Sequence, residues 1–243
     1  MYKKLLIKQF EIDFNCDSEL LQESFFLTST SNSDARYWDR NKADIVCFNN
    51  KIFVRTEIEA LTKELEKLYG NINAEWFLEM NHIYKLNHTL KKYQLKIERI
   101  APFFIPNKVI NSEEIPLTFQ RFNQEDIFNF KQNKQITESF CYSEHDPDQI
   151  GFGYYVDNTL IAICGANKNG KYTWEIGIEI LDRNFNKKGI ATMLVKTLIS
   201  TIQKEQPNII PVYSTSLSHT NSMNVAINAG CRVGWSEIII SEI

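Results

Sequence analysis

Short hydrophobic runs separated by polar turns dominate the second half of the chain. Runs of 4–8 residues rich in β-branched and aromatic side chains predict strands. Strands are predicted over residues 117–122, 153–156 and 160–165, and a longer one over 172–181. Asp157-Asn158 and Asn169-Gly170 are the turn residues between them, and Asn-Gly is a strong hairpin signal.

Helical spacing interrupts this series of strands. Ile190, Leu194, Leu198 and Ile202 recur on one face and predict a helix over residues 188–204, which ends before Pro207. A strand over 209–214, a short helix over 221–228 and a final strand over 233–240 follow. Counting a helix from Glu125 onward, the order is β-α-β-β-β-α-β-α-β. That order predicts an α/β (α+β) domain with a mixed central sheet flanked by helices.

The first half is expected to be richer in helix. Two short strands are predicted within residues 44–55, around the turn at Asn49-Asn50. Thr56 and Glu59 fit a capping box for a helix that ends near Gly70. Its apolar face holds Leu61, Leu65 and Leu68. A second helix, over 74–93, carries an apolar stripe expected to face the core: Trp76, Phe77, Met80, Ile83, Tyr84 and Leu90.

The length and the proline pattern predict two domains. The chain has 243 residues, which suits two small domains or one large one. Pro106 and Pro116 enclose a polar segment typical of a linker. The predicted division is an α-rich N-terminal domain over 1–105, a linker over 106–115 and a second domain over 116–243.

Composition narrows the function classes. The net charge of −3 and the absence of a basic cluster argue against nucleic-acid binding. Five scattered cysteines without a CxxC pair argue against a disulfide framework and a zinc site, and favour a reducing, cytoplasmic compartment. No apolar run approaches the roughly 18 residues that span a membrane.

The segment WEIGIEILDRNFNKKGIATML, residues 174–194, carries the most specific chemistry. A strand leads through a short loop and Gly189 into a helix, whose first N–H groups can bind phosphate. Lys187 and Lys188 add positive charge beside them. The pattern lacks the glycines and the lysine position of a P-loop, and it has one of the three glycines of a dinucleotide fingerprint. An ordinary strand-to-helix turn would have the same features.

The residues 186–191, NKKGIA, resemble the acetyl-CoA loop of the GNAT superfamily of N-acyltransferases, Gln/Arg-x-x-Gly-x-Gly/Ala. The stretch HTNSMNVAINAGC, 219–231, is similar to the closing motif of that family. The resemblance covers residues 116–243. It implies a mostly antiparallel sheet that opens beside the loop, with the first 105 residues as an N-terminal extension.

The resemblance also implies a set of site residues. Acetyl-CoA is the expected co-substrate. Its pantetheine arm would pair with backbone at Glu179, Ile180 and Leu181, and a backbone N–H near Glu179 would stabilise the oxyanion. The pyrophosphate would be held by Asn186, Lys187, Lys188, Gly189, Ile190, Ala191 and Thr192, with Asn221 nearby. Glu175 occupies the position of the general base found in histone-acetylating members; it could also be an ordinary solvated strand residue.

Four positions depart from the family pattern: Asn186, His219, Ala226 and Cys231. Ala226 stands where many members have a tyrosine that protonates the thiolate, so the motif does not identify the general acid of this chain. His219 is the preferred replacement because histidine titrates near neutrality. The alternatives are Tyr213, Ser216 and Ser218.

The sequence therefore predicts an N-acetyltransferase that acts on a small-molecule or peptide amine, without nucleic-acid or membrane partners and with a homodimer left open. A second hypothesis is a catalytically silent acyl-CoA-binding module, because the tyrosine is missing. A third is an interaction protein whose N-terminal half carries the function.

Overall fold

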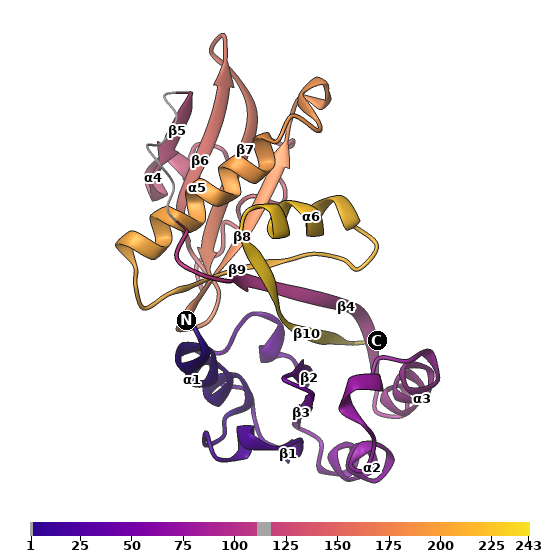
Figure 1. The fold of residues 1–243 in the computed structure, drawn as a ribbon. Helices are drawn as coiled ribbons and strands as arrows, with labels where there is room; N and C mark the ends of the chain where they lie inside the picture. Colours follow the sequence, from indigo (N-terminus) through magenta and orange to yellow (C-terminus); the bar gives the residue numbers. More distant parts are fainter. Residues whose placement is uncertain (1, 111–117) are drawn as a thin grey trace. The chain divides into compact units, whose positions relative to one another are not determined.

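The computed structural model describes residues 2–110 and 118–243 (Figure 1). Its contacts divide the chain into two compact units. The C-terminal unit is built mainly from Phe104–Thr215 and His219–Arg232. The N-terminal unit comprises Lys3–Phe103, Ser216–Ser218 and Val233–Ile243. Part of the predicted linker, residues 111–115, lies outside the described residues, so the two-domain boundaries stay a prediction.

The C-terminal unit contains five strands of the sheet, in the order β9-β8-β7-β6-β5. All neighbours pair antiparallel except β8 and β9, which are parallel. The strands are β5 (Phe119–Phe122), β6 (Asp148–Val156), β7 (Thr159–Lys168), β8 (Thr173–Ile180) and β9 (Ile210–Ser214). The predicted mixed, mostly antiparallel sheet is confirmed.

Helices cover both faces of these strands. On one face α5 (Ile190–Glu205) and α6 (Thr220–Asn228) bury a core that includes Ile176, Leu194 and Leu198. Figure 1 shows α5 crossing β6 and β7 on that face. On the other face α4 (Gln124–Phe128) and the segment after it bury a second core with Phe140 and Ile163. Alternate strand residues serve the two cores, as a pleated strand requires.

The turns predicted at Asp157-Asn158 and Asn49-Asn50 are present, and their residues adopt left-handed backbone conformations. Asp157 and Asn158 have φ of 49° and 61°, and Asn49 and Asn50 have φ of 48° and 58°. Asparagine and aspartate tolerate this left-handed region better than other non-glycine residues, and the turn matches the twist of the flanking strands. Both hairpins, β6–β7 and β2–β3, therefore form as predicted.

The N-terminal unit contains strands as well as helices, in the order β1-β3-β2-β10-β4. Its strands are β1 (Phe25–Thr28), β2 (Ala43–Phe48), β3 (Lys51–Thr56), β4 (Leu95–Pro106) and β10 (Cys231–Glu242). Its helices are α1 (Lys3–Phe14), α2 (Glu59–Tyr69) and α3 (Met80–Lys91), with 3-10 turns η1 (Leu20–Gln22), η2 (Trp38–Arg40) and η3 (Ala74–Trp76). The sequence did not predict α1, β1 or β4.

Two local predictions in this unit are wrong. The N-cap of α2 is Ile58, because the Thr56 hydroxyl is engaged instead with the Thr62 hydroxyl, 2.8 Å away, and with the Ile58 backbone. The predicted helix over 74–93 is broken into η3 and α3. Consequently three residues of the apolar stripe are exposed by 60–76% and do not face the core: Trp76, Met80 and Tyr84.

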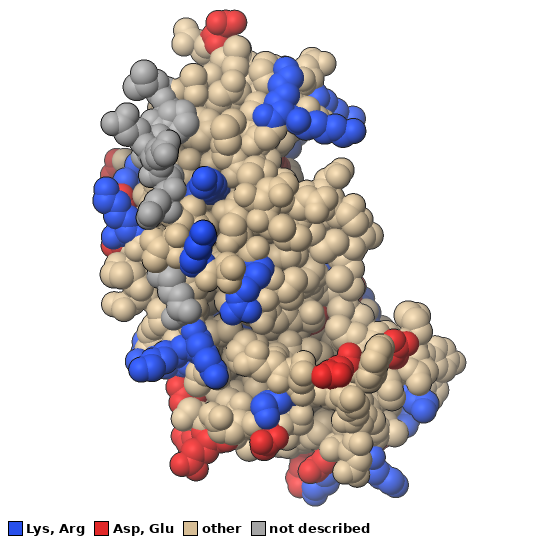
Figure 2. Space-filling view, in the orientation of Figure 1, with Lys and Arg blue, Asp and Glu red and all other residues tan. Residues whose placement is uncertain are grey.

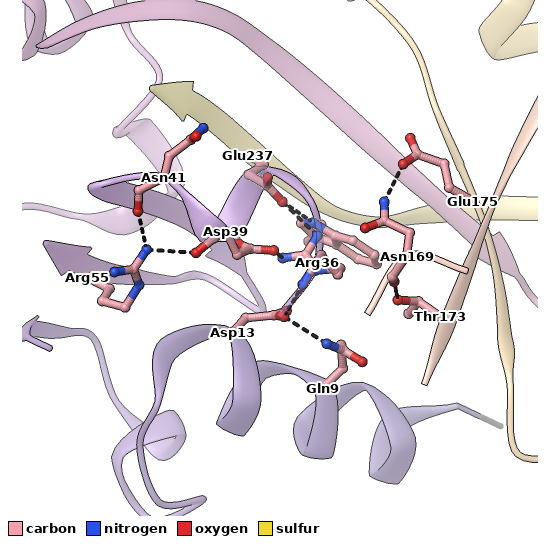
Figure 3. Close-up of polar contacts among 11 residues, drawn as sticks. Gln9, Asp13, Arg36, Asp39, Asn41, Arg55, Asn169, Thr173, Glu175 and Glu237 are labelled. Atoms are coloured by element: carbon pink, nitrogen blue, oxygen red, sulfur yellow. Dashed lines mark hydrogen bonds and ion pairs between the residues drawn. The ribbon is translucent and has the colours of Figure 1, made fainter. Parts of the chain in front are cut away.

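A charged cluster lies in the core of the N-terminal unit (Figure 3). Arg36 is 1% exposed and pairs with Asp13, Asp39 and Glu237 at 2.7–2.8 Å. Its guanidinium also lies over the Trp235 ring, 4.9 Å from the centroid. Burial raises the pKa of Glu237 to about 7, although Arg36 opposes the shift. Strand β10 supplies both Trp235 and Glu237.

Candidate active site

The two parallel strands β8 and β9 separate partway along β8. Their pairing runs from Thr173–Ile210 to Ile176–Tyr213 and ends there. Beyond that point β8 continues to pair with β7 as far as Ile180. One edge of residues 177–180 therefore has no recorded strand partner in the described part of the chain. An open strand edge of this kind can pair with an extended ligand.

Glu175 lies at the point of separation. One carboxylate oxygen accepts a 2.6 Å hydrogen bond from the Ser214 hydroxyl on β9. The other accepts from the Asn169 amide, a contact that Figure 3 shows. Both donors are neutral, and the described residues include no Lys or Arg ion pair to Glu175. The side chain is partly exposed. The carboxylate is thus held in place but remains an acceptor for a proton.

The loop that follows β8 contains a 3-10 turn and two residues with left-handed backbone. Asp182 caps the 3-10 turn η4 (Arg183–Phe185) through the Asn184 N–H at 2.9 Å. Lys187 and Gly189 then have φ of 61° and 80°, in the left-handed region. Backbone in this conformation directs successive N–H groups to one side, where they can bind an anion.

Helix α5 begins directly at this loop. Gly189 is its N-cap, and a Cβ at Gly189 would meet nothing within 4 Å. The Gly189 carbonyl accepts from the Met193 N–H at 3.0 Å, so the N–H groups of Ile190, Ala191 and Thr192 precede the first intrahelical bond. The predicted loop therefore leads into an open helix N-terminus, which suits a pyrophosphate.

Basic side chains surround this loop. Arg183, Lys187 and Lys188 are exposed. Figure 2 shows Lys and Arg gathered where Figure 1 places the loop between β8 and α5. Lys188 Nζ lies 4.2 Å from the centroid of the Phe185 ring. The charge of the loop is complementary to a polyphosphate.

Helix α6 carries the second predicted group of residues. His219 is its N-cap, and its carbonyl accepts from Ser222 and Met223 at 3.0 and 3.1 Å. His219 and Asn221 are both exposed. No hydrogen bond joins His219 to Glu175 among the described residues, so the structure does not assemble them into a pair.

Tyr213 is the nearest phenol to the separation point along β9. It is buried, and its hydroxyl lies 2.7 Å from the Ser222 hydroxyl of α6. Burial raises the pKa of Tyr213. Ser216 and Ser218, the other candidates, bond to each other at 2.9 Å. Ala226 is buried in the core of the unit.

The buried thiols are unsuited to nucleophilic chemistry. Burial raises the pKa of Cys164 and of Cys231 to about 12. The thiolate is therefore scarce at neutral pH. Both residues belong to the hydrophobic core next to α5, where they pack as small hydrophobes.

Glu179 has contacts that the sequence did not indicate. Its carboxylate accepts hydrogen bonds from Thr137 N and Oγ1 at 2.6 and 3.1 Å, and from Ser139 N and Oγ at 3.2 and 2.9 Å. The partners lie about forty residues earlier in the chain. No local spacing connects them, so a single sequence could not have revealed this contact.

Comparison with family models finds a match over part of the chain. Residues 113–226 match the model of the acetyltransferase (GNAT) family. No curated protein matches the chain. In the part of the chain that the structure describes, no helix is long and apolar enough to cross a bilayer.

Three solved structures resemble the chain at low similarity. An acetyltransferase from the GNAT family of Colwellia psychrerythraea aligns over 99% of this chain and 96% of its own, with 13% identity and a TM-score of 0.46. A GCN5-related N-acetyltransferase-like protein from Streptococcus suis aligns over 100% of both chains, with 8% identity and a TM-score of 0.45. A GCN5-related N-acetyltransferase from Kribbella flavida aligns with 12% identity and a TM-score of 0.46. The alignment covers 65% of this chain and 63% of the Kribbella protein. Likenesses at this level say nothing of substrates.

Proposed function

We propose that the protein transfers an acetyl group from acetyl-CoA to a primary amine by direct attack, because residues 113–226 match the model of the acetyltransferase (GNAT) family. The observation that carries the proposal is the combination of two features of β8. The strand opens on one edge beyond Ile176, and it leads into the left-handed turn at Gly189. An extended thioester with a polyphosphate end fits this combination.

In this proposal the backbone of the loop binds the phosphates. The N–H groups from Lys187 to Thr192 would hold the pyrophosphate, with the Lys187 and Lys188 side chains neutralising its charge. The Asn186 N–H already donates to Arg183 O at 3.1 Å, so Asn186 would border the site without donating its N–H. The open edge near Glu179, Ile180 and Leu181 would pair with the pantetheine arm. The Leu181 N–H already donates to Ile161 O at 2.8 Å, so this N–H is not available for such pairing. Asn221 would border the arm from α6.

Glu175 would act as the general base. The amine nitrogen attacks the thioester carbonyl carbon while its proton passes to the Glu175 carboxylate. The C–S bond then breaks, which releases an amide and the CoA thiolate, and the thiolate takes up a proton. The hydrogen bonds from Ser214 and Asn169 support this role because they fix the carboxylate where β8 and β9 separate.

His219 remains our proposed proton donor to the thiolate. Its exposed ring lies at the start of α6, and histidine exchanges protons near neutral pH. The hydroxyl of Tyr213 is the alternative, although the raised pKa makes it a weaker acid.

Acetyl-CoA with a panel of amines tests the proposal. The expected results are a higher melting temperature with acetyl-CoA and release of free thiol with at least one amine. Binding without thiol release from any amine would favour a silent acyl-CoA-binding module. Absence of both would overturn the proposal.

A further inference from the structure

A row of three glycines crosses the face of the sheet that carries Glu175. Gly151 of β6 is paired with Gly165 of β7, which is paired with Gly177 of β8. Because the three residues are in register on adjacent strands, their missing side chains leave a shallow channel across the sheet.

The segment of residues 137–142, here termed the strap, fills this channel. A Cβ at Gly177 would lie 1.8 Å from the Glu138 carbonyl oxygen, and one at Gly165 would lie 2.5 Å from the Ser139 carbonyl oxygen. A Cβ at Gly151 would lie 2.9 Å from the Phe140 ring. None of these distances is tolerated, so the glycines are required by the approach of the strap and not by backbone conformation.

Glu179 holds the start of the strap. Its carboxylate receives the four hydrogen bonds from Thr137 and Ser139 described above, and the Ser139 hydroxyl also lies 2.9 Å from Ile163 O. Hydrogen bonds to a carboxylate are stronger than those between neutral groups. Glu179 has no Lys or Arg ion pair in the described ranges, so these N–H and O–H groups are its recorded partners.

Asp148 holds the end of the strap. Its carboxylate accepts from the N–H groups of Cys141 and Tyr142 at 3.0 and 2.9 Å. Tyr142 has φ of 50°, a strained conformation for a tyrosine. Two carboxylates thus fix the strap at its two ends.

The strap lies beside the proposed general base. Glu175, Gly177 and Glu179 point to one face of β8, because side chains alternate along a strand. Gly177 is the neighbour of Glu175 on that face, about 6.6 Å away along the strand. The strap covers Gly177, so an amine that reaches Glu175 from this face must pass the strap.

We infer that Glu179 is a positioning residue, which acts through the strap to shape the acceptor side of the active site. This inference rests on the proposed acetyl transfer. It assigns a role to the Glu179 side chain, which contacts the strap, and not to its backbone. Loss of the carboxylate should therefore weaken use of the amine and leave acetyl-CoA binding nearly unchanged.

Hydrogen exchange tests the contact without any need for activity. In Glu179→Ala we expect exchange of the Thr137 and Ser139 amides to accelerate at least 10-fold. Glu179→Gln keeps one oxygen acceptor and should give an intermediate effect. Glu144→Ala removes an exposed carboxylate from the same loop and serves as the matched control. Unchanged exchange in Glu179→Ala would overturn the inference.

Steady-state kinetics test the acceptor role. Glu179→Ala removes the hydrogen bonds that hold the strap, and Gly177→Ala introduces a clash with it. Each should raise the KM of the amine about 10-fold while the Kd of acetyl-CoA changes less than 2-fold. Gly153→Ala is the control for Gly177, because its Cβ would meet the Leu160 and Phe122 side chains and not the strap. An unchanged amine KM despite faster exchange would contradict the acceptor role. If the wild-type protein shows no turnover with any amine, the proposed function and the acceptor role are both contradicted. Hydrogen exchange of the Thr137 and Ser139 amides would still show whether Glu179 holds the strap.

Discussion

Ser214 donates a 2.6 Å hydrogen bond to Glu175, one residue beyond the last β8–β9 pair. The bond joins β8 and β9 at the position where their pairing ends, so the point of separation of the two strands fixes the direction of the carboxylate.

Replacement of Glu175 by Gln should lower kcat by about 10²–10⁴-fold, the usual contribution of a general base. The amide retains the shape and can still accept from Ser214, so acetyl-CoA binding should persist. Thiol release across pH is the measurement. The variant should retain a rising alkaline limb as free amine becomes abundant. A variant as active as wild type at neutral pH would show that Glu175 is an ordinary strand residue.

Replacement of Gly189 by Glu should abolish the rise in melting temperature caused by acetyl-CoA. A non-glycine residue at φ of 80° is strained, and a negative charge would enter the phosphate-binding loop. Saturating ligand stabilises by about 2.7 kcal/mol at 100 times its Kd, so the loss is readily measured by thermal shift. Lys196→Gln changes the net charge equally on an exposed position of α5 and should preserve the rise. If Gly189→Glu still responds, the ligand binds elsewhere.

His219→Ala and Tyr213→Phe distinguish the two candidate acids. If His219 protonates the thiolate, its removal should lower kcat by at least about 10²-fold with little change in acetyl-CoA affinity. Tyr213→Phe should then have a small effect on kcat. The opposite order would assign the proton to the Tyr213–Ser222 pair. Weakened cofactor binding with kcat preserved would make His219 a binding residue.

The free energy of unfolding should fall as pH rises from about 4.5 to about 7. The pKa of Glu237 is about 7 in the folded protein against an ordinary value of 4.5, so the folded state holds a proton that the unfolded state has lost. This contribution is complete below the ordinary value and disappears as pH passes the folded one. At about 1.4 kcal/mol per pH unit it amounts to at most a few kcal/mol.

Urea denaturation at pH 5 and pH 8 measures this difference. Burial raises the pKa values of Asp13 and Asp39 as well, in the same direction, so the comparison needs a variant. Glu237→Gln should reduce the pH dependence because it removes a titrating group and keeps an oxygen for Arg36 and Trp235. Equal pH dependence in both proteins would place the effect on other carboxyl groups.

Local signals predicted the elements of the C-terminal unit well. The 3.6-residue spacing of Ile190, Leu194 and Leu198 and the Asn-rich turns act over a few residues, and sheet and helices formed as expected. The same approach failed at Thr56, because its hydroxyl pairs with Thr62 in the folded chain. It also failed for Trp76, whose exposure depends on the break between η3 and α3.

The candidate site was predictable only where it is local. The loop around Gly189 is contiguous, so its residues could be named from the sequence. The Glu175–Ser214 and Glu179–Ser139 contacts join residues 39 and 40 positions apart. Such contacts depend on strand register and on the path of the strap, and neither can be predicted from the spacing of residues in the sequence.

Strand β10 has a consequence for the order in which the protein is made. The core of the N-terminal unit includes Trp235 and Glu237, which hold the buried Arg36 through a ring contact and an ion pair. A ribosome therefore releases residues 3–103 long before their own core can be completed, whereas domains usually fold in the order of synthesis. Until Val233–Ile243 emerges, Arg36 lacks these two partners, so the core of the N-terminal unit is completed only after the rest of the chain has been made.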